Sequence, residues 1–151
     1  MKKLVLSLVI ALTGLWASAQ SDKKEVEAIK KVIETAYLNG VQNIGNMDLI
    51  DAGFHPDFRM QVLEKDGSLS NVSLDEFKQR VKNNIDKGVL PRPEGKQVSV
   101  EFLSIDVSKY AATLKMDYIL EGKSVYIDYM QLYKFPEGWK IVNKIYYTVG
   151  D

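Results

Sequence analysis

The stretch YIDYMQLYKFPEGWKIVNKIYY, residues 126–147, decides the fold of this chain. Large apolar and aromatic side chains alternate with polar ones on both sides of residues 136–138, as they do in two half-buried antiparallel strands. Proline followed closely by glycine is typical of a three-residue hairpin loop whose glycine is left-handed. We expect this loop to pair Phe135 with Trp139, and the whole stretch to form the last hairpin of a β-meander.

Two more strand-like segments, residues 98–107 and 111–121, precede this hairpin. A two-residue turn at residues 122–123 would pair Glu121 with Ser124. The two turns together then fix the register and place Gln131 opposite Asn143. The face predicted to point inward carries Ala112, Leu114, Met116, Tyr118, Leu120, Val125, Ile127, Tyr129, Gln131, Tyr133, Phe135, Trp139, Ile141, Asn143, Ile145 and Tyr147. The opposite face is predicted to carry Lys115, Asp117, Asp128, Lys140 and Lys144, together with Tyr126, Met130 and Tyr146.

Three helices are predicted before the meander. Apolar residues recur every three or four positions over residues 22–44, the stripe of an amphipathic helix, and residues 47–52 allow two further turns. Residues 58–72 read as a strand, a turn and a short return strand. The segment Ser73-Leu74-Asp75-Glu76 is a capping box that begins a third helix. The chain is therefore expected to be an α+β protein with one domain.

Residues 1–19 have the features of a secretory signal peptide. Two lysines precede an apolar run, and Ala17-Ser18-Ala19 provides a small-x-small cleavage site. Cleavage near Ala19 would leave residues 20–151 as a periplasmic or secreted domain, without a membrane-inserted helix. The chain has no cysteine, so no disulfide framework is expected.

The charge balance argues against a nucleic-acid partner. The chain has 20 basic and 20 acidic residues, and no basic stripe runs along it. It has a single histidine, without a second partner for an acid/base arrangement. We expect neither a metal site nor a cofactor.

The order of elements, together with residues 126–147, resembles the nuclear transport factor 2-like superfamily. Within it, FHPDFRM at residues 54–60 and the run from Asp128-Tyr129 to Gly138-Trp139-Lys140-Ile141-Val142-Asn143-Lys144 resemble the putative lumazine-binding protein family, whose members are small and often exported. The resemblance covers essentially the whole chain after the signal peptide. It implies a cone-shaped, cystatin-like α+β fold with three N-terminal helices packed on a curved, mostly antiparallel sheet. The family name implies a pterin-like ligand, but the superfold hosts isomerases, dehydratases, hydrolases, ligand binders and dimerisation modules.

The segment FHPDFRM has two interpretations. His55 and Asp57 could form an acid/base pair, since histidine titrates near neutral pH. We favour the alternative, a structural corner in which Arg59 pairs with Asp57 or with a helix end. Glu101 is a third catalytic candidate if its strand faces inward, and two registers with opposite facing are open. Asp128 is expected on the charged face, in an exposed ion pair with lysines. No catalytic residue is assigned.

Aromatic side chains on the predicted inner face favour a ligand pocket, although a large core would need the same composition. The predicted pocket residues are Tyr118, Tyr129, Gln131, Tyr133, Trp139 and Asn143. Our first hypothesis is an exported domain that binds a small, flat, apolar or aromatic molecule without catalysis. One alternative is an isomerase, dehydratase or hydrolase with an acid or base in the cone. The other is a homodimer formed through the outer face of the sheet.

Overall fold

The computed structural model describes residues 22–150. A helix over residues 22–32 continues as the wider π-helix η1, and it is followed by two α-helices and six strands. The elements are η1 (Ile33–Asn43), α2 (Met47–Gly53), β1 (Phe54–Leu63), β2 (Leu69–Ser73), α3 (Leu74–Asp86), β3 (Val98–Ser108), β4 (Ala111–Leu120), β5 (Lys123–Phe135) and β6 (Gly138–Thr148). The predicted signal peptide lies outside the described residues.

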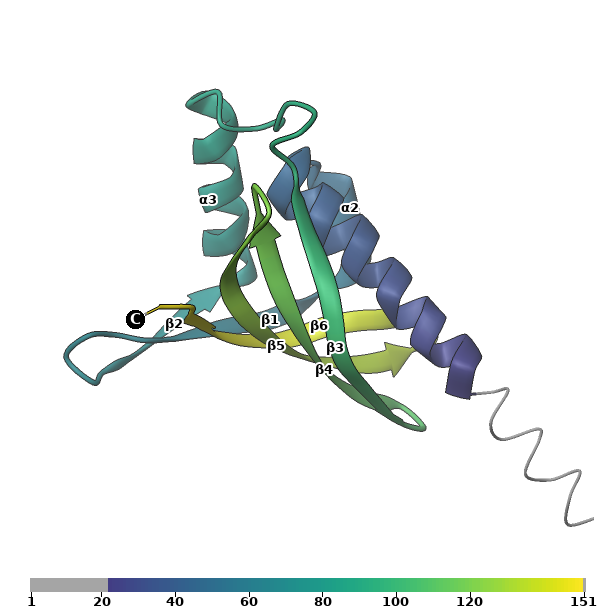
Figure 1. Cartoon of the computed structure of the whole chain (residues 1–151). Coiled ribbons are helices and arrows are strands. Elements are labelled where there is room, and N and C mark those ends of the chain that lie inside the picture. The colour runs from purple at the N-terminus through teal and green to yellow at the C-terminus, as the bar shows by residue number, and fades with distance from the viewer. Residues whose placement is uncertain (1–21, 151) are drawn as a thin grey trace, which may run out of the picture.

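The six strands form one curved sheet in the order β2-β1-β6-β5-β4-β3. Strand β1 runs parallel to β6, and every other neighbouring pair is antiparallel. Figure 1 shows the long N-terminal helix and α3 standing on the same side of this sheet. The predicted α+β architecture of helices on a curved, mostly antiparallel sheet is confirmed. Among residues 22–150, no helix is long and apolar enough to cross a membrane.

Local sequence signals explain where the helices begin. The Ser73 side chain accepts a hydrogen bond from the Glu76 amide at 3.3 Å, and the Glu76 carboxylate accepts one from the Ser73 amide at 2.7 Å. This is the predicted capping box, in which two otherwise unpaired amides are satisfied reciprocally. Asn46 caps α2 by a single hydrogen bond, which its side chain accepts from the Leu49 amide.

Buried polar contacts fix the N-terminal helix against the sheet. The Asn43 amide side chain donates to the Val98 carbonyl at 3.0 Å and accepts from the Val98 amide at 2.8 Å, which ties the end of η1 to the start of β3. At the opposite end, Trp139 Nε1 donates to the Glu25 carboxylate at 2.8 Å. The two anchors hold the helix at a fixed height over the inner face of the sheet.

The predicted register between β4 and β5 is wrong by one residue. The turn lies at Glu121-Gly122, both with positive φ, so that Leu120 pairs with Lys123. A bulge then leaves Val125 without a partner, and Tyr118 pairs with Tyr126. A shift of one residue moves every side chain of a strand to the other face. Strand β4 faces as predicted, but β5 is reversed, with Tyr126, Asp128, Met130 and Leu132 inward.

The register between β5 and β6 contains two compensating departures from the prediction. The loop is one residue shorter than expected, because Phe135 pairs with Gly138. A bulge at Val142 adds one unpaired residue to β6 and compensates for the shorter loop, so that Gln131 lies opposite Asn143 as predicted. The Asn143 side-chain amide donates a 3.2 Å hydrogen bond to Gln131 Oε1. Beyond this bulge Lys144 and Tyr146 face inward, while Ile145 and Tyr147 face outward.

Candidate functional site

A pocket of about 310 Å³ opens on the inner side of the sheet, between η1 and α3. We call it the cone pocket. Its walls come from two helices and four strands that are far apart in the sequence. The lining residues are Tyr37, Val41, Gln42, Met60, Phe77, Arg80, Val81, Asn84, Tyr118, Tyr126, Lys144 and Tyr146.

A buried ion pair lies at the base of this pocket. Lys144 Nζ donates to Asp128 Oδ1, and the Tyr37 hydroxyl donates to Asp128 Oδ2 at 2.7 Å. Asp128 is 0% exposed and Lys144 is 4% exposed. Both carboxylate oxygens thus have a donor, which is the condition under which a buried charge is tolerated. Asp128 was predicted to lie on the solvent face, and that prediction is wrong because the bulge at Val125 turns it inward.

Burial shifts the ionisation of the groups around Asp128. Burial and the neighbouring Asp128 charge raise the pKa of Tyr37 well above its ordinary value, so that its hydroxyl keeps its proton and remains a donor. Burial lowers the pKa of Lys144, and the Asp128 carboxylate opposes this effect. The ammonium group also lies 4.4 Å from the centroid of the Tyr146 ring, a cation–π contact.

Three tyrosines on adjacent strands form one wall of the cone pocket. The Tyr118 and Tyr126 rings meet edge to face with centroids 5.3 Å apart, and Tyr126 meets Tyr146 at the same distance. The Tyr118 hydroxyl donates to Gln42 Oε1 at 3.1 Å. Burial raises the pKa of Tyr118 to about 12. The Tyr118 hydroxyl is therefore a neutral hydrogen-bonding group at physiological pH.

One arginine lines the pocket mouth and a second lies near it. Arg80, on α3, lines the pocket and is exposed. Arg92 donates from Nε to the Gln42 carbonyl at 2.9 Å, and its charge counteracts the rise in the pKa of Tyr118. Asn84 adds an amide beside them. The mouth is thus polar and positively charged, whereas Met60, Phe77 and Val81 make an apolar wall farther in.

The predicted pocket residues do not share one cavity. Tyr118 lines the cone pocket as expected. Trp139 is buried beside the N-terminal helix, where it bonds Glu25. Tyr129, Tyr133, Gln131 and Asn143 belong to the outer face, because of the bulges at Val125 and Val142. The predicted inner-face wall of Tyr129 and Tyr133 is therefore wrong.

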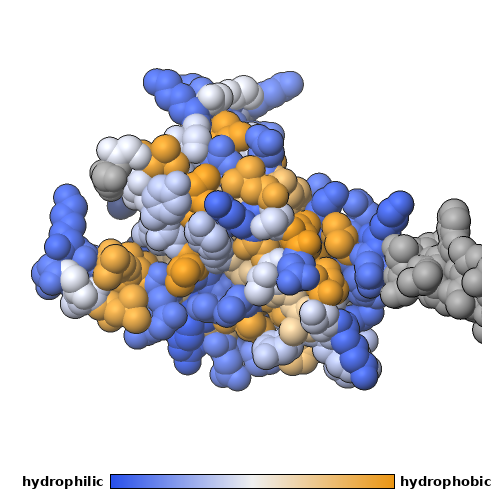
Figure 2. All heavy atoms as spheres, turned by 60° about the horizontal axis from the view of Figure 1, so that its bottom comes forward, coloured by the Kyte–Doolittle hydropathy of each residue, from blue (hydrophilic) through white to orange (hydrophobic). Residues whose placement is uncertain are grey.

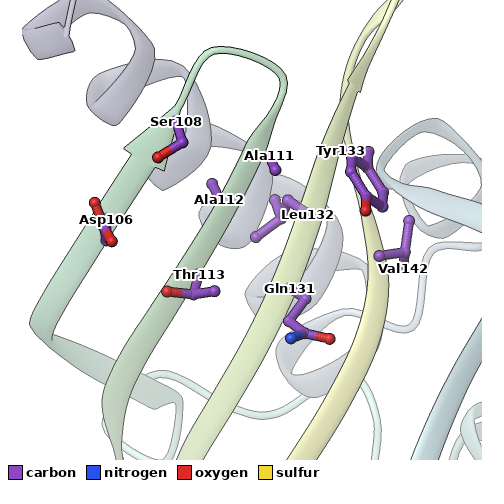
Figure 3. A pocket seen from close by; sticks show the side chains of 9 residues that line it. All are labelled: Asp106, Ser108, Ala111, Ala112, Thr113, Gln131, Leu132, Tyr133 and Val142. Carbon is purple, nitrogen blue, oxygen red and sulfur yellow. The ribbon is translucent and has the colours of Figure 1, made fainter.

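The outer face has depressions of its own. One of about 200 Å³ lies over β3 to β6, and Figure 3 shows the side chains that line it, including Asp106, Thr113, Gln131 and Tyr133. A neighbouring one of about 370 Å³ shares Thr113 and Gln131 and adds Tyr129. Both depressions are open and lie on the surface of the sheet, and the ion pair is on its other side.

The three catalytic candidates lie away from the cone pocket. His55 Nδ1 accepts a hydrogen bond from the Asp57 amide at 3.1 Å, and its ring stacks on Phe135 with centroids 4.8 Å apart. The Asp57 side chain is 87% exposed. Arg59 does not pair with Asp57, the first of its two predicted partners, and donates to the Phe58 carbonyl, while its charge helps to lower the pKa of Glu76 in the first turn of α3. Glu101 is exposed and lies opposite Asp117 in the β3–β4 ladder, on the outer face of the sheet. Of the two registers that the sequence left open for this hairpin, the structure has the one in which Glu101 faces outward.

One of the residues with a wrongly predicted position carries a signal in the sequence. An aspartate within a β-strand is unusual, which singles out Asp128, but the facing of its side chain depends on a bulge. Arg80 and Asn84 flank the buried side of α3, which is formed by Leu74, Phe77 and Val81. Polar residues beside the apolar stripe of a helix look the same in the sequence whether they line a pocket mouth or lie on the open surface.

A family model described as "Putative lumazine-binding" matches residues 24–147. The chain belongs to this family. The match includes every lining residue of the cone pocket, as well as Asp128. The lumazine-binding-like family thus accounts for the whole described domain except its first two and last three residues. No curated protein matches the chain.

Solved structures show the same fold. A nuclear transport factor 2-like protein of unknown function from Shewanella baltica OS155 is 21% identical, with a TM-score of 0.66 over 85% of this chain and 96% of that one. One from Silicibacter pomeroyi DSS-3 is 17% identical, with a TM-score of 0.67 over 84% and 98%. A domain with a cystatin-like fold from Nostoc punctiforme PCC 73102 is 16% identical, with a TM-score of 0.53 over 82% and 76%. At these identities the likeness concerns the fold alone.

Proposed function

We propose that this protein is an exported, non-catalytic binder of a small planar molecule, which it holds in the cone pocket. The family description supports ligand binding in general. The signal-like residues 1–19 support export to the periplasm or the outside of the cell. The observation that carries the proposal is the cone pocket itself, in which tyrosines, an ion pair and an apolar wall converge on one cavity.

The cavity has the size and composition of a small-molecule site. Its volume of about 310 Å³ is near the lower end of the range for ligand pockets, roughly 300 to 1,000 Å³. Aromatic walls with polar tips combine a large contact area with hydrogen-bonding groups. Because both oxygens of Asp128 are already bonded, we assign the ion pair to positioning Lys144 and Tyr37 rather than to proton transfer.

The test is mass spectrometry of small molecules extracted from protein purified from its native source. Wild-type protein is expected to release a bound compound. Asn84→Trp fills the pocket mouth from an exposed position and should abolish its recovery. Asn83→Trp is the matched control, because Asn83 is the neighbouring exposed residue on the same helix and does not line the pocket. Equal recovery from both variants would show that the compound binds elsewhere.

A second candidate function, homodimerisation through the outer face, is favoured by an aromatic patch there. We define the outer patch as Tyr129, Tyr133, Ile145 and Tyr147, all between 38% and 54% exposed. Tyr129 and Ile145 are cross-strand partners. Figure 2, which brings the lower side of Figure 1 forward, shows groups of apolar side chains separated by hydrophilic ones. Such a mixture suits a modest interface of about 800 Å² per partner.

The residues first expected on that face, Tyr126, Met130 and Tyr146, point inward and take no part in this proposal. Sedimentation at tens of micromolar should show a dimer, and Ile145→Lys should convert it to a monomer by placing a charge in the patch. The control is Val89→Lys, at an exposed apolar residue outside the sheet. A monomeric wild-type protein would exclude this candidate without affecting the first.

A further inference from the structure

The charges of the cone pocket do not cancel. Its lining includes two cations, Arg80 and Lys144, and no carboxylate. Asp128 lies behind the lining and is bonded to Lys144, so that this pair is neutral overall. Among residues 22–150, Arg80 has no carboxylate oxygen within 4.0 Å in the structure. Arg80 therefore makes no direct ion pair there, and its charge acts on the Glu76 carboxyl, one turn earlier on α3, only from a distance, where it helps to lower the pKa of that group.

Arg92 is a second arginine near the pocket, although it does not itself line the cavity. Its guanidinium is fixed by the 2.9 Å bond to the Gln42 carbonyl, close to the hydroxyl of Tyr118. Arg80 lines the pocket beside Tyr146, at the other end of the tyrosine wall, and its charge opposes the rise that burial causes in the pKa of Tyr146. The two guanidinium groups thus flank the wall, and each retains N–H donors for a ligand. A guanidinium matches the planar geometry of a carboxylate better than that of any neutral group.

The shape of the pocket restricts which molecules can bind between these charged groups. The wall of Tyr118, Tyr126 and Tyr146 faces an apolar wall that includes Phe77 and Val81. A flat ring between two such walls gains stacking and apolar contacts together. The volume of about 310 Å³ admits a molecule of a few fused rings.

We infer that the ligand of the cone pocket is a planar aromatic acid whose anionic group binds Arg80 at the mouth while its ring lies against the tyrosine wall. This inference rests on the proposed ligand-binding function and deepens it. Lys144, held by Asp128, provides a donor at the base for an acceptor atom on the far edge of the ring.

Two probes of nearly the same shape test the inference, 2-naphthoate and 2-naphthamide. Calorimetry on the purified protein is expected to show that the carboxylate binds at least about tenfold more tightly than the neutral amide, since a hydrogen bond to a charged group is stronger than one to a neutral group. Arg80→Gln should remove the preference by weakening naphthoate alone, and Arg80→Lys should restore part of it. Lys82→Gln removes an exposed charge from the same helix and should leave the preference unchanged.

Amide chemical shifts locate the bound probe. Naphthoate should perturb residues around Tyr126 and Tyr146 and leave the outer patch unaffected. Equal binding of the two probes to wild-type protein would overturn the inference and leave the proposed function standing. A preference that persists in Arg80→Gln would overturn the role of Arg80. Binding of neither probe would also overturn the inference, whereas failure of the proposed function would appear separately, as extraction of the same compound from Asn84→Trp protein.

Discussion

Lys144 on β6 and Asp128 on β5 are diagonal neighbours across two strands, and they form an ion pair that is shielded from solvent. Asp128 pairs directly with Tyr146, and Lys144 pairs with Met130, so both charged side chains project from the same face. Tyr37 reaches this pair from η1 and supplies the second donor to the carboxylate. A helix and two strands are thereby joined at one buried point beneath the cone pocket.

Asp128→Asn should destabilise the protein strongly. The substitution leaves Lys144 buried without a counter-charge, and breaking a buried pair from one side costs about 3 to 5 kcal/mol. Urea unfolding of wild-type and variant protein measures the change. In the double variant Asp128→Asn with Lys144→Met, no buried charge remains and the loss should be clearly smaller. If the single and double variants unfold at the same urea concentration, the ion pair does not have the structural role described here.

Stability should fall above about pH 10 because of the tyrosines. The pKa of Tyr118 is about 12 in the folded protein and 10.0 as a free side chain. The folded state therefore keeps a proton that the unfolded state loses, so this contribution is complete below about pH 10 and is lost as the pH rises toward 12. Lys144 acts in the opposite direction, since its pKa is lowered by burial.

Comparison of wild-type protein with Tyr118→Phe separates the two effects. Unfolding by urea at several values between pH 8 and pH 11.5 should show a steeper loss for wild type than for the variant. Absorbance of tyrosinate near 295 nm provides an independent measurement, and one fewer late-titrating group is expected in Tyr118→Phe. Identical pH profiles would show that Tyr118 titrates normally.

The sequence predicted the fold but not the facing of two strands, and the reason is physical. Hydrophobic periodicity and capping signals are local, and they identified the helices, the hairpins and the order of these elements along the chain. The face on which a side chain lies depends on the number of residues between it and the turn of its hairpin, because side chains alternate between the two faces. A bulge adds one residue to this number and so reverses the facing of all residues beyond it. Val125 and Val142 are the bulged residues, and neither is glycine or a turn former that would have indicated a bulge.

The same bulges explain which part of the site was predictable. Tyr118 lies on β4, whose facing was predicted correctly, and it lines the cone pocket. Asp128 and Lys144 lie beyond a bulge and were placed on the wrong face. The predicted pair Gln131–Asn143 is present because the shorter loop and the bulge at Val142 compensate, yet it belongs to the outer face.

Gly53→Ala should disturb the packing of α2 against the N-terminal helix. A methyl group at Gly53 would lie 2.2 Å from the Ala36 side chain, which no real contact permits. Overpacking of this kind typically costs about 1 to 3 kcal/mol. Thermal unfolding should show a lower midpoint, and Ala36→Gly in the same background should restore part of it by removing the other methyl group. A Gly53→Ala protein as stable as wild type would contradict the close approach of the two helices.

The corner at residues 54–60 offers the last prediction. The His55 ring stacks on Phe135, whereas the largely exposed Asp57 carboxylate lies 3.8 Å from His55 Nδ1, so substitution of His55 should affect stability more. His55→Asn preserves an acceptor for the Asp57 amide but loses the stacking on Phe135, worth about 0.5 to 1.5 kcal/mol. Asp57→Ala removes an exposed carboxylate and should change stability by about 0.5 kcal/mol or less.

A double-mutant cycle identifies the source of the His55 effect. In a Phe135→Leu background the stacking partner is absent, so His55→Asn should cost less than it does in wild-type protein. Urea unfolding gives the four free energies. Binding of 2-naphthoate should be the same in wild type and His55→Asn, because His55 lies outside the cone pocket. A variant that folds normally but loses naphthoate binding would assign the segment FHPDFRM to the ligand site after all.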